Sequence, residues 1–207
     1  MIGMWQGLGR GARVVLPVVL VGAIVQGLLV VGDPTPHVDW VFALRVVVSG
    51  LVMIVVVWLI VGVAATAVDA DAGLSIPSIR LLIGVTSAVV GGALAGVLSP
   101  ILPIVVAVAG LPVLSALAVR PWTAPIRMVM VSPFRTLLGF VLVATLFIVI
   151  WVTALLLGFF IAGPVAAMLT WVVFGFSTAI AATYWAALHR RSLAQDKPEA
   201  GASTRTV

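Results

Sequence analysis

The sequence predicts an all-α protein, a polytopic bundle of about six transmembrane helices with both termini in the cytoplasm. Three observations lead to this fold class. Of the 207 residues, 63% are hydrophobic and 8% are charged, whereas soluble domains have about 45–50% apolar and about 25% charged residues. Long uncharged segments are separated by short polar or proline-containing breaks. When these segments are counted as crossings, nearly all basic residues fall on one side of the membrane.

The composition also excludes several classes of protein. A chain with a mean hydropathy of +1.34 has too little polar surface to cover itself in water. A net charge of +5 suggests nucleic-acid binding in a soluble chain. In a membrane chain it indicates basic cytoplasmic loops, so we expect no nucleic-acid partner. The absence of cysteine excludes disulfides, thiolate nucleophiles and cysteine-based metal sites.

Two crossings are predicted in the first third of the chain, because a crossing takes about 20 mainly apolar residues. The run 14–31 is the first, and the polar segment 33–40 ends it. Arg10 and Arg13 before this run resemble the start of a signal peptide. No A-x-A-like cleavage site follows it, so we interpret the run as a retained helix. The second crossing is 46–68.

Two longer uncharged runs are each predicted to contain two crossings. The run 81–119 would form a single helix about 58 Å long, nearly twice the roughly 30 Å hydrocarbon core. Ser99-Pro100 divides this run near its middle, and Gly163-Pro164 divides the run 137–188 in the same way. Six crossings follow.

The alternative is a count of five or four crossings. Pro103 and Pro112 both lie in the segment 101–119. They would suit a re-entrant or strongly kinked segment there, although transmembrane helices tolerate proline when neighbouring groups satisfy the freed carbonyls.

The distribution of basic residues predicts the orientation. With six crossings, the positive-inside rule places both termini in the cytoplasm of a plasma (inner) membrane. Arg45 is then the one basic residue on the outer side. The other ten lie on the cytoplasmic side: Arg10, Arg13, Arg80, Arg120, Arg127, Arg135, Arg190, Arg191, Lys197 and Arg205.

The chain is predicted to form a single transmembrane helical domain over 1–191, followed by a cytoplasmic tail over 192–207. The tail is rich in small and polar residues and has no hydrophobic periodicity. Such a composition predicts disorder.

Small residues recur every four positions in the third segment, at Gly84, Ala88, Gly92 and Gly96. A stripe of this kind lets two helix backbones approach closely in lipid, where no hydrophobic drive brings helices together. We interpret the stripe as a packing face within one chain. Dimerisation through the same face is the alternative.

Four polar residues near or within the crossings are candidates for a binding site. Gln26 is the only amide in a predicted crossing and either lines a substrate path or bonds across helices. Arg45 lies at the outer edge of the second segment, where its stem can reach the interface. Asp69 and Asp71 end the second segment, where carboxylates oppose the helix dipole. A local turn or salt bridge explains them more simply than a proton relay.

The connection 120–135 carries three widely spaced arginines, Arg120, Arg127 and Arg135, among apolar residues. This pattern is typical of a segment in the membrane interface whose arginines contact anionic lipid phosphates. Ordinary positive-inside anchoring is the simpler interpretation, and a specific lipid or phosphate site is the alternative.

The sequence lacks the usual machinery for catalysis. His37 and His189 are predicted on opposite sides of the membrane, and the first glutamate is Glu199. No nucleophile elbow, P-loop or H-E-x-x-H motif occurs. Asp69 and Asp71 are wrongly spaced for the carboxylate metal sites of phosphatidyltransferases. We therefore expect no enzyme activity, no cofactor and no bound metal.

Three groups of residues at helix boundaries carry a family resemblance. They are Gly73, Ser75, Pro77 and Ser78 after the second crossing; Ile126, Arg127, Ser132, Phe134, Arg135 and Gly139 before the fifth; and Tyr184, Trp185, Leu188, His189, Arg190 and Arg191 at the end of the sixth. On these residues the chain resembles bacterial six-helix integral membrane proteins similar to the membrane domain of some glycerophosphodiester phosphodiesterases. The resemblance implies tight helical hairpins with amphipathic cytoplasmic connections. It implies no hydrolase activity, because no catalytic barrel accompanies these helices.

Together these features predict a non-enzymatic integral membrane protein of a bacterial plasma membrane, acting as an accessory or scaffold subunit or as a lipid-interacting protein. Its expected partners are membrane lipids, including anionic ones, and other membrane protein subunits. The alternative is a small transporter or the membrane subunit of one, with Pro103, Gly110 and Pro112 allowing broken, moving helices. A shortage of polar groups at mid-membrane argues against transport of a hydrophilic solute.

The orientation can be tested with single cysteines, because the chain has none of its own. In intact cells Pro36→Cys should react with an impermeant thiol reagent. Cysteines at Ser75, Thr123 or Ser203 should react only after the membrane is permeabilised. Labelling of Thr123→Cys from outside would contradict the predicted orientation.

Overall fold

In the part of the chain that the computed structural model describes, six helices are long and apolar enough to cross a membrane. The structure describes residues 2–32, 39–68, 76–99, 101–119, 128–130, 132–161 and 163–194. The helices are α1 (Ile2–Leu28), α2 (Trp40–Ala67), α3 (Ile79–Leu98), α4 (Leu102–Val119), α6 (Pro133–Phe160) and α7 (Gly163–Ala194). No strand occurs in these ranges. The predicted all-α fold class is confirmed, and the chain is a multi-pass integral membrane protein.

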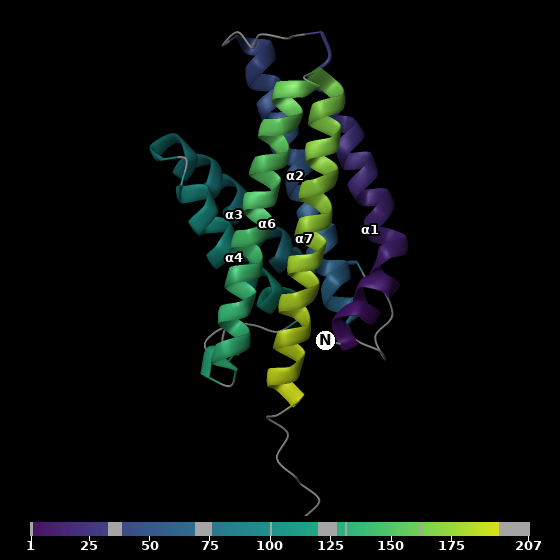
Figure 1. Ribbon diagram of the computed structural model, residues 1–207, viewed down its shortest axis with the longest axis vertical. Coiled ribbons are helices and arrows are strands. Elements are labelled where there is room, and N and C mark those ends of the chain that lie inside the picture. The colour runs from purple at the N-terminus through teal and green to yellow at the C-terminus, as the bar shows by residue number, and fades with distance from the viewer. Residues whose placement is uncertain are drawn as a thin grey trace, which may run out of the picture.

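The helices divide into a main bundle and a hairpin (Figure 1). In the main bundle α7 packs against α1, α2 and α6, and α1 also packs against α2. The hairpin consists of α3 and α4 and leans away from α6. The described residues of α3 approach α2 and α4 but not α6 or α7. α1 begins and α7 ends at the same end of the bundle.

Several helices extend beyond the predicted crossings. α1 begins at Ile2 and already contains Arg10 and Arg13, and α7 continues to Ala194, three residues past the predicted limit of the domain at 191. Ser192 is buried and its hydroxyl donates to the carbonyl of His189 at 2.7 Å. An apolar run indicates only the part of a helix that lies in hydrocarbon. Backbone hydrogen bonds continue the helix beyond that run. Residues 195–207 of the predicted tail lie outside the described residues.

Side-chain caps fix where two helices begin. The Asp39 carboxylate accepts a hydrogen bond from the N–H of Phe42 at 2.8 Å at the start of α2. The Ser78 hydroxyl accepts one from the N–H of Leu81 at 3.3 Å at the start of α3. Each cap satisfies a donor in the first turn that has no partner within the helix.

The two prolines of α4 do not interrupt it. Leu102–Val119 is one continuous helix of 18 residues, about 27 Å long. Pro103 lies in its first turn, where a missing N–H costs nothing. Pro112 lies inside the helix and is buried. The segment forms one helix long enough to span a membrane, as the count of six crossings predicts.

The turn between α3 and α4 is apolar but satisfies its described backbone donors. The N–H of Ile101 bonds to the Ser99 hydroxyl at 3.4 Å, and the N–H of Leu102 bonds to the Ser99 carbonyl at 3.2 Å. The N–H of Ile104 bonds to the Ile101 carbonyl at 3.1 Å, and proline at 103 has no N–H to satisfy. A turn of this kind is compatible with a location in or near hydrocarbon.

α7 is the central helix because it contributes to each of three buried clusters. Ala179 packs with Val19 of α1 and Ile60 of α2. Ala182 belongs to a cluster that also contains Val57 of α2, Val85 of α3 and Leu114 of α4. Trp185 packs with Val143 of α6 and Met128, and with Ala181 and Leu188 of its own helix. The alanines leave room for neighbouring helices on several sides.

Two glycines allow close approaches between helices of the main bundle. A Cβ atom on Gly175 of α7 would lie 2.7 Å from both methyl groups of Val19 of α1. A Cβ atom on Gly22 of α1 would lie 2.7 Å from a methyl group of Val56 of α2. Real Cβ atoms do not come so close, so a larger side chain forces the helices apart.

We expect Gly175→Leu to destabilise the bundle by about 1–3 kcal/mol, the usual cost of overpacking. The measurement is the thermal unfolding midpoint of the purified protein in detergent. Gly158→Leu is the matched control, because Gly158 is exposed on α6 and a Cβ there meets nothing within 4 Å. Equal midpoints for the two variants would contradict the close approach of α1 and α7.

Candidate functional site

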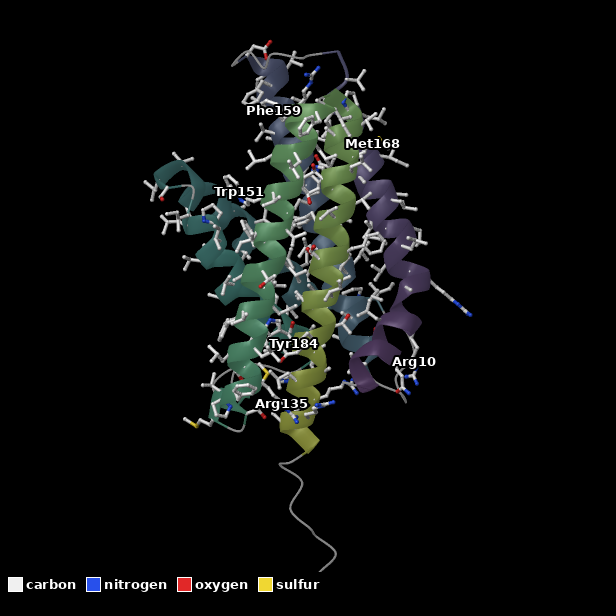
Figure 2. All side chains as sticks on the ribbon, viewed as in Figure 1. Arg10, Arg135, Trp151, Phe159, Met168 and Tyr184 are labelled. Carbon is white, nitrogen blue, oxygen red and sulfur yellow. The ribbon has the colours of Figure 1, made fainter. Side chains whose placement is uncertain are left out.

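The described arginines are concentrated at one end of the bundle. We call this the arginine-bearing end; α1, α3 and α6 begin there and α7 ends there. It carries Arg10, Arg13, Arg80, Arg135, Arg190 and Arg191, all exposed except the half-buried Arg190. Figure 2 shows the labelled Arg10 and Arg135 at this end, with Phe159 and Met168 toward the opposite end. The opposite end, where α2 begins, carries Arg45.

A clamp between α6 and α7 holds Arg135 in place. The Tyr184 hydroxyl donates to the main-chain carbonyl of Arg135 at 2.7 Å, and both residues lie near the arginine-bearing end in Figure 2. Gly139 allows this contact, since a Cβ there would lie 2.8 Å from the rings of both Tyr184 and Trp185. The first turn of α6 is thereby fixed against α7, while the Arg135 side chain stays exposed.

An apolar groove runs between α4 and α6 toward this clamp. It encloses about 390 Å³ and is lined by Val105, Val108, Pro112, Met128, Thr136 and Phe140, among others; we call it the α4–α6 groove. Val105 is exposed, so the groove opens on the lipid-facing surface. Thr136 lies next to Arg135 in the chain, and its hydroxyl donates to the carbonyls of Met128 and Ser132 at 3.2 and 2.9 Å.

Trp185 forms the deep wall of the α4–α6 groove. It is fully buried, and its ring meets that of Phe140 edge to face with centroids 5.2 Å apart. Its indole N–H has no hydrogen-bond partner within the part of the chain that the structure describes. The wall of the groove is therefore a rigid aromatic pair anchored in the core.

A second, larger cavity lies between the α3–α4 hairpin and the main bundle. It has a volume of about 430 Å³ and is lined by residues of five helices, including Val57, Gly92, Gly110, Leu114, Phe147 and Ser177; we call it the hairpin cavity. Its only described hydroxyls are those of Ser177 and Thr178. The Thr178 hydroxyl already donates to the carbonyl of Phe174 at 2.8 Å. The cavity is therefore almost entirely apolar.

The predicted stripe of small residues on α3 lies against α4 of the same chain, and its contacts vary along its length. A Cβ on Gly84 would lie 2.7 Å from a methyl group of Leu117, and one on Gly96 would lie 3.2 Å from Pro103. Gly92 has an ordinary contact at 3.8 Å. Ala88, Gly92 and Gly96 also line the hairpin cavity. The stripe thus packs tightly at Gly84 and borders open space further along.

Gln26 is engaged with α2. Its side chain is 3% exposed. Its amide nitrogen donates to the carbonyl of Ser49 at 3.0 Å, and its amide oxygen accepts from the Ser49 hydroxyl at 2.8 Å. This reciprocal pair joins α1 to α2 and uses both ends of the amide. Gln26 lines neither the α4–α6 groove nor the hairpin cavity.

The two other predicted binding residues that the structure describes, Arg45 and Arg135, lie at opposite ends of the bundle. Arg45 is half-buried on α2, whereas Arg135 lies at the arginine-bearing end. The Asp39 carboxylate caps α2. Asp69, Asp71, Arg120 and Arg127 lie outside the described residues.

The small residues of α3 that line the hairpin cavity were visible as a stripe in the sequence, whereas the aromatic and polar residues of α6 and α7 that line the two cavities were not. Phe147 and Ser177 of the hairpin cavity and Phe140 of the groove belong to long apolar runs in which nearly every residue is hydrophobic. In such runs a residue that faces lipid has the same character as one that faces a cavity. The sequence therefore carried no signal for them.

Comparison with known protein families, characterised proteins and solved structures finds no match for this chain.

We expect Gln26→Leu and Ser49→Ala each to destabilise the protein by roughly 0.5–1.7 kcal/mol, the range measured for hydrogen bonds between membrane helices. The measurement is a double-mutant cycle on unfolding in detergent. Because the two side chains bond to each other, the second substitution should cost less than it does alone. Strictly additive costs would show that the pair makes no direct contribution.

Proposed function

We propose that this protein is a non-enzymatic integral membrane protein of a bacterial plasma membrane that binds anionic phospholipid in the cytoplasmic leaflet. The observation that carries the proposal is the α4–α6 groove, an open apolar groove whose lining includes Thr136, the neighbour of Arg135 at the arginine-bearing end.

The apolar groove suits the acyl chain of a phospholipid, and Arg135 suits its phosphate. The acyl chain would lie along Val105, Val108 and Phe140, whose side chains are apolar. The phosphate would meet the exposed guanidinium of Arg135, with which it forms charge-assisted hydrogen bonds. The Tyr184 clamp fixes the main chain of Arg135 relative to α7. The hydrogen bond does not hold the side chain, so the guanidinium extends from a fixed position on the bundle.

The charge asymmetry supports the choice of leaflet. Six described arginines lie in the first or last turns of helices at one end of the bundle or close to them, and Arg45 lies near the start of α2 at the other end. The positive-inside rule assigns the arginine-bearing end to the cytoplasm. The cytoplasmic leaflet holds the anionic lipids that attract basic residues, at about 1 kcal/mol for each arginine near the surface.

A non-enzymatic role agrees with the chemistry of both cavities. None of the described residues lining them is ionisable. The protein would then act through the lipid it holds or as an accessory or scaffold subunit for other membrane proteins. A transporter of hydrophilic solutes would need several polar partners near mid-membrane, and the hairpin cavity offers two hydroxyls.

The test is retention of phosphatidylglycerol over phosphatidylcholine, measured by native mass spectrometry after mild detergent extraction. Wild-type protein should retain phosphatidylglycerol preferentially. Arg135→Gln should lower its affinity about fivefold, the equivalent of about 1 kcal/mol. The clamp should survive, because Tyr184 bonds to the main chain of residue 135.

Arg45→Gln is the matched control, since it removes the same charge at the opposite end of the bundle. It should leave retention of phosphatidylglycerol unchanged. Equal retention of the two lipids by the wild type, or equal losses in both variants, would contradict a site at Arg135.

A further inference from the structure

The hairpin cavity is closed at one end and open at the other. Val85, Leu114 and Ala181 form its inner end and are buried. Ala93 and Gly96 form its rim on α3 and are exposed. α3 begins at the arginine-bearing end, so this rim lies toward the opposite end, near the apolar α3–α4 turn. The cavity is therefore a pocket that is closed toward the arginine-bearing end and opens laterally near the opposite end.

The rim is continuous with the surface that faces lipid. Leu94 and Val97 next to it are 66% and 85% exposed. The described residues of α3 do not approach α6 or α7, so no helix contact seals this side. In a membrane the apolar molecule adjacent to such an opening is the tail of a phospholipid.

The cavity stays open because small residues of α3 and α4 face it. A Cβ on Gly92 would have one ordinary contact, 3.8 Å from Val106, and a Cβ on Gly110 would lie 4.0 Å from that of Ala88. The hairpin itself is held at Gly84 and Gly96, where Cβ atoms would meet Leu117 and Pro103.

Water is a poor occupant of this space. A buried water typically makes two to four hydrogen bonds. The lining provides the hydroxyls of Ser177 and Thr178, and that of Thr178 already donates to Phe174. An empty space would leave the apolar walls without the dispersion contacts that a packed interior provides. A hydrocarbon chain provides those contacts and needs no polar partner.

We propose that the hairpin cavity holds one acyl chain of a phospholipid from the leaflet at the opposite end of the bundle. The chain enters past Gly96 and Pro103, and its terminal methyl lies near Leu114 and Ala181. This site is separate from the α4–α6 groove. The groove uses Val105, Val108 and Pro112 of α4, whereas the cavity uses Pro103, Val106, Gly110 and Leu114 of that helix.

The experiment uses photoreactive lipids in vesicles of phosphatidylethanolamine and phosphatidylglycerol that contain the full chain. One phosphatidylcholine carries a diazirine at the end of an acyl chain, and a second carries it near the ester. After irradiation, labelled residues are mapped by mass spectrometry. The first probe should label the inner end at Leu114 and Ala181, and the second should label the rim at Gly96 and Pro103.

Gly92→Leu places a side chain in the cavity and should reduce labelling of the inner end by at least about tenfold, because a filled pocket excludes the chain. Gly110→Leu does the same from the facing wall and serves as the second variant if the first fails to fold. Gly91→Leu is the matched control, since a Cβ there meets nothing within 4 Å and Gly91 does not line the cavity. It should label like the wild type.

Three outcomes would overturn the proposal. Labelling confined to exposed residues such as Val97 would place the probes on the outer surface. Equal labelling of the inner end in Gly92→Leu and Gly91→Leu would show that the label does not enter through the cavity. The reverse order of the two probes would mean that the chain enters from the arginine-bearing end. Arg135 does not line the hairpin cavity, so Arg135→Gln can lose phosphatidylglycerol binding without changing the labelling inside the cavity. Each of the two proposals can therefore fail while the other holds.

Discussion

The structure depends on how closely α7 can be approached by its neighbours. In hydrocarbon, apolar side chains gain nothing by leaving lipid for another helix, so association rests on dispersion contacts and hydrogen bonds at short range. Gly175 and the alanines at 179, 181 and 182 provide such contacts to several neighbouring helices. The Gln26–Ser49 pair adds a polar connection between α1 and α2.

The hairpin shows the other consequence of small residues. Where Gly84 faces Leu117, the absence of a side chain brings α3 and α4 together. Where Gly92 and Gly110 face a space that α6 and α7 do not fill, the same absence leaves a cavity. A glycine therefore produces contact or void depending on how the opposing helix is tilted. In this protein the hairpin leans away from α6 (Figure 1), and a void results.

Sequence reasoning was strongest where the signal was long. Each helix corresponds to some twenty mainly apolar residues, so the six segments were predicted correctly, with divisions close to Ser99-Pro100 and Gly163-Pro164. Helix ends were predicted less well, because backbone bonding continues past the apolar run, as at Ile2 and Ala194. Among candidate site residues, Arg135 lies beside a groove, whereas Gln26 proved to join two helices.

The sequence by itself determined the class of protein and the end of the bundle at which the arginines gather, because hydropathy and charge are properties of residues in order along the chain. Only the tertiary structure decided where the cavities lie. A leucine that faces lipid, one in the core and one that lines a cavity all have apolar surroundings. The sequence therefore does not distinguish the three positions. The tilt of α3 and α4 against α6 separates them, and that tilt follows from contacts between residues far apart in the chain.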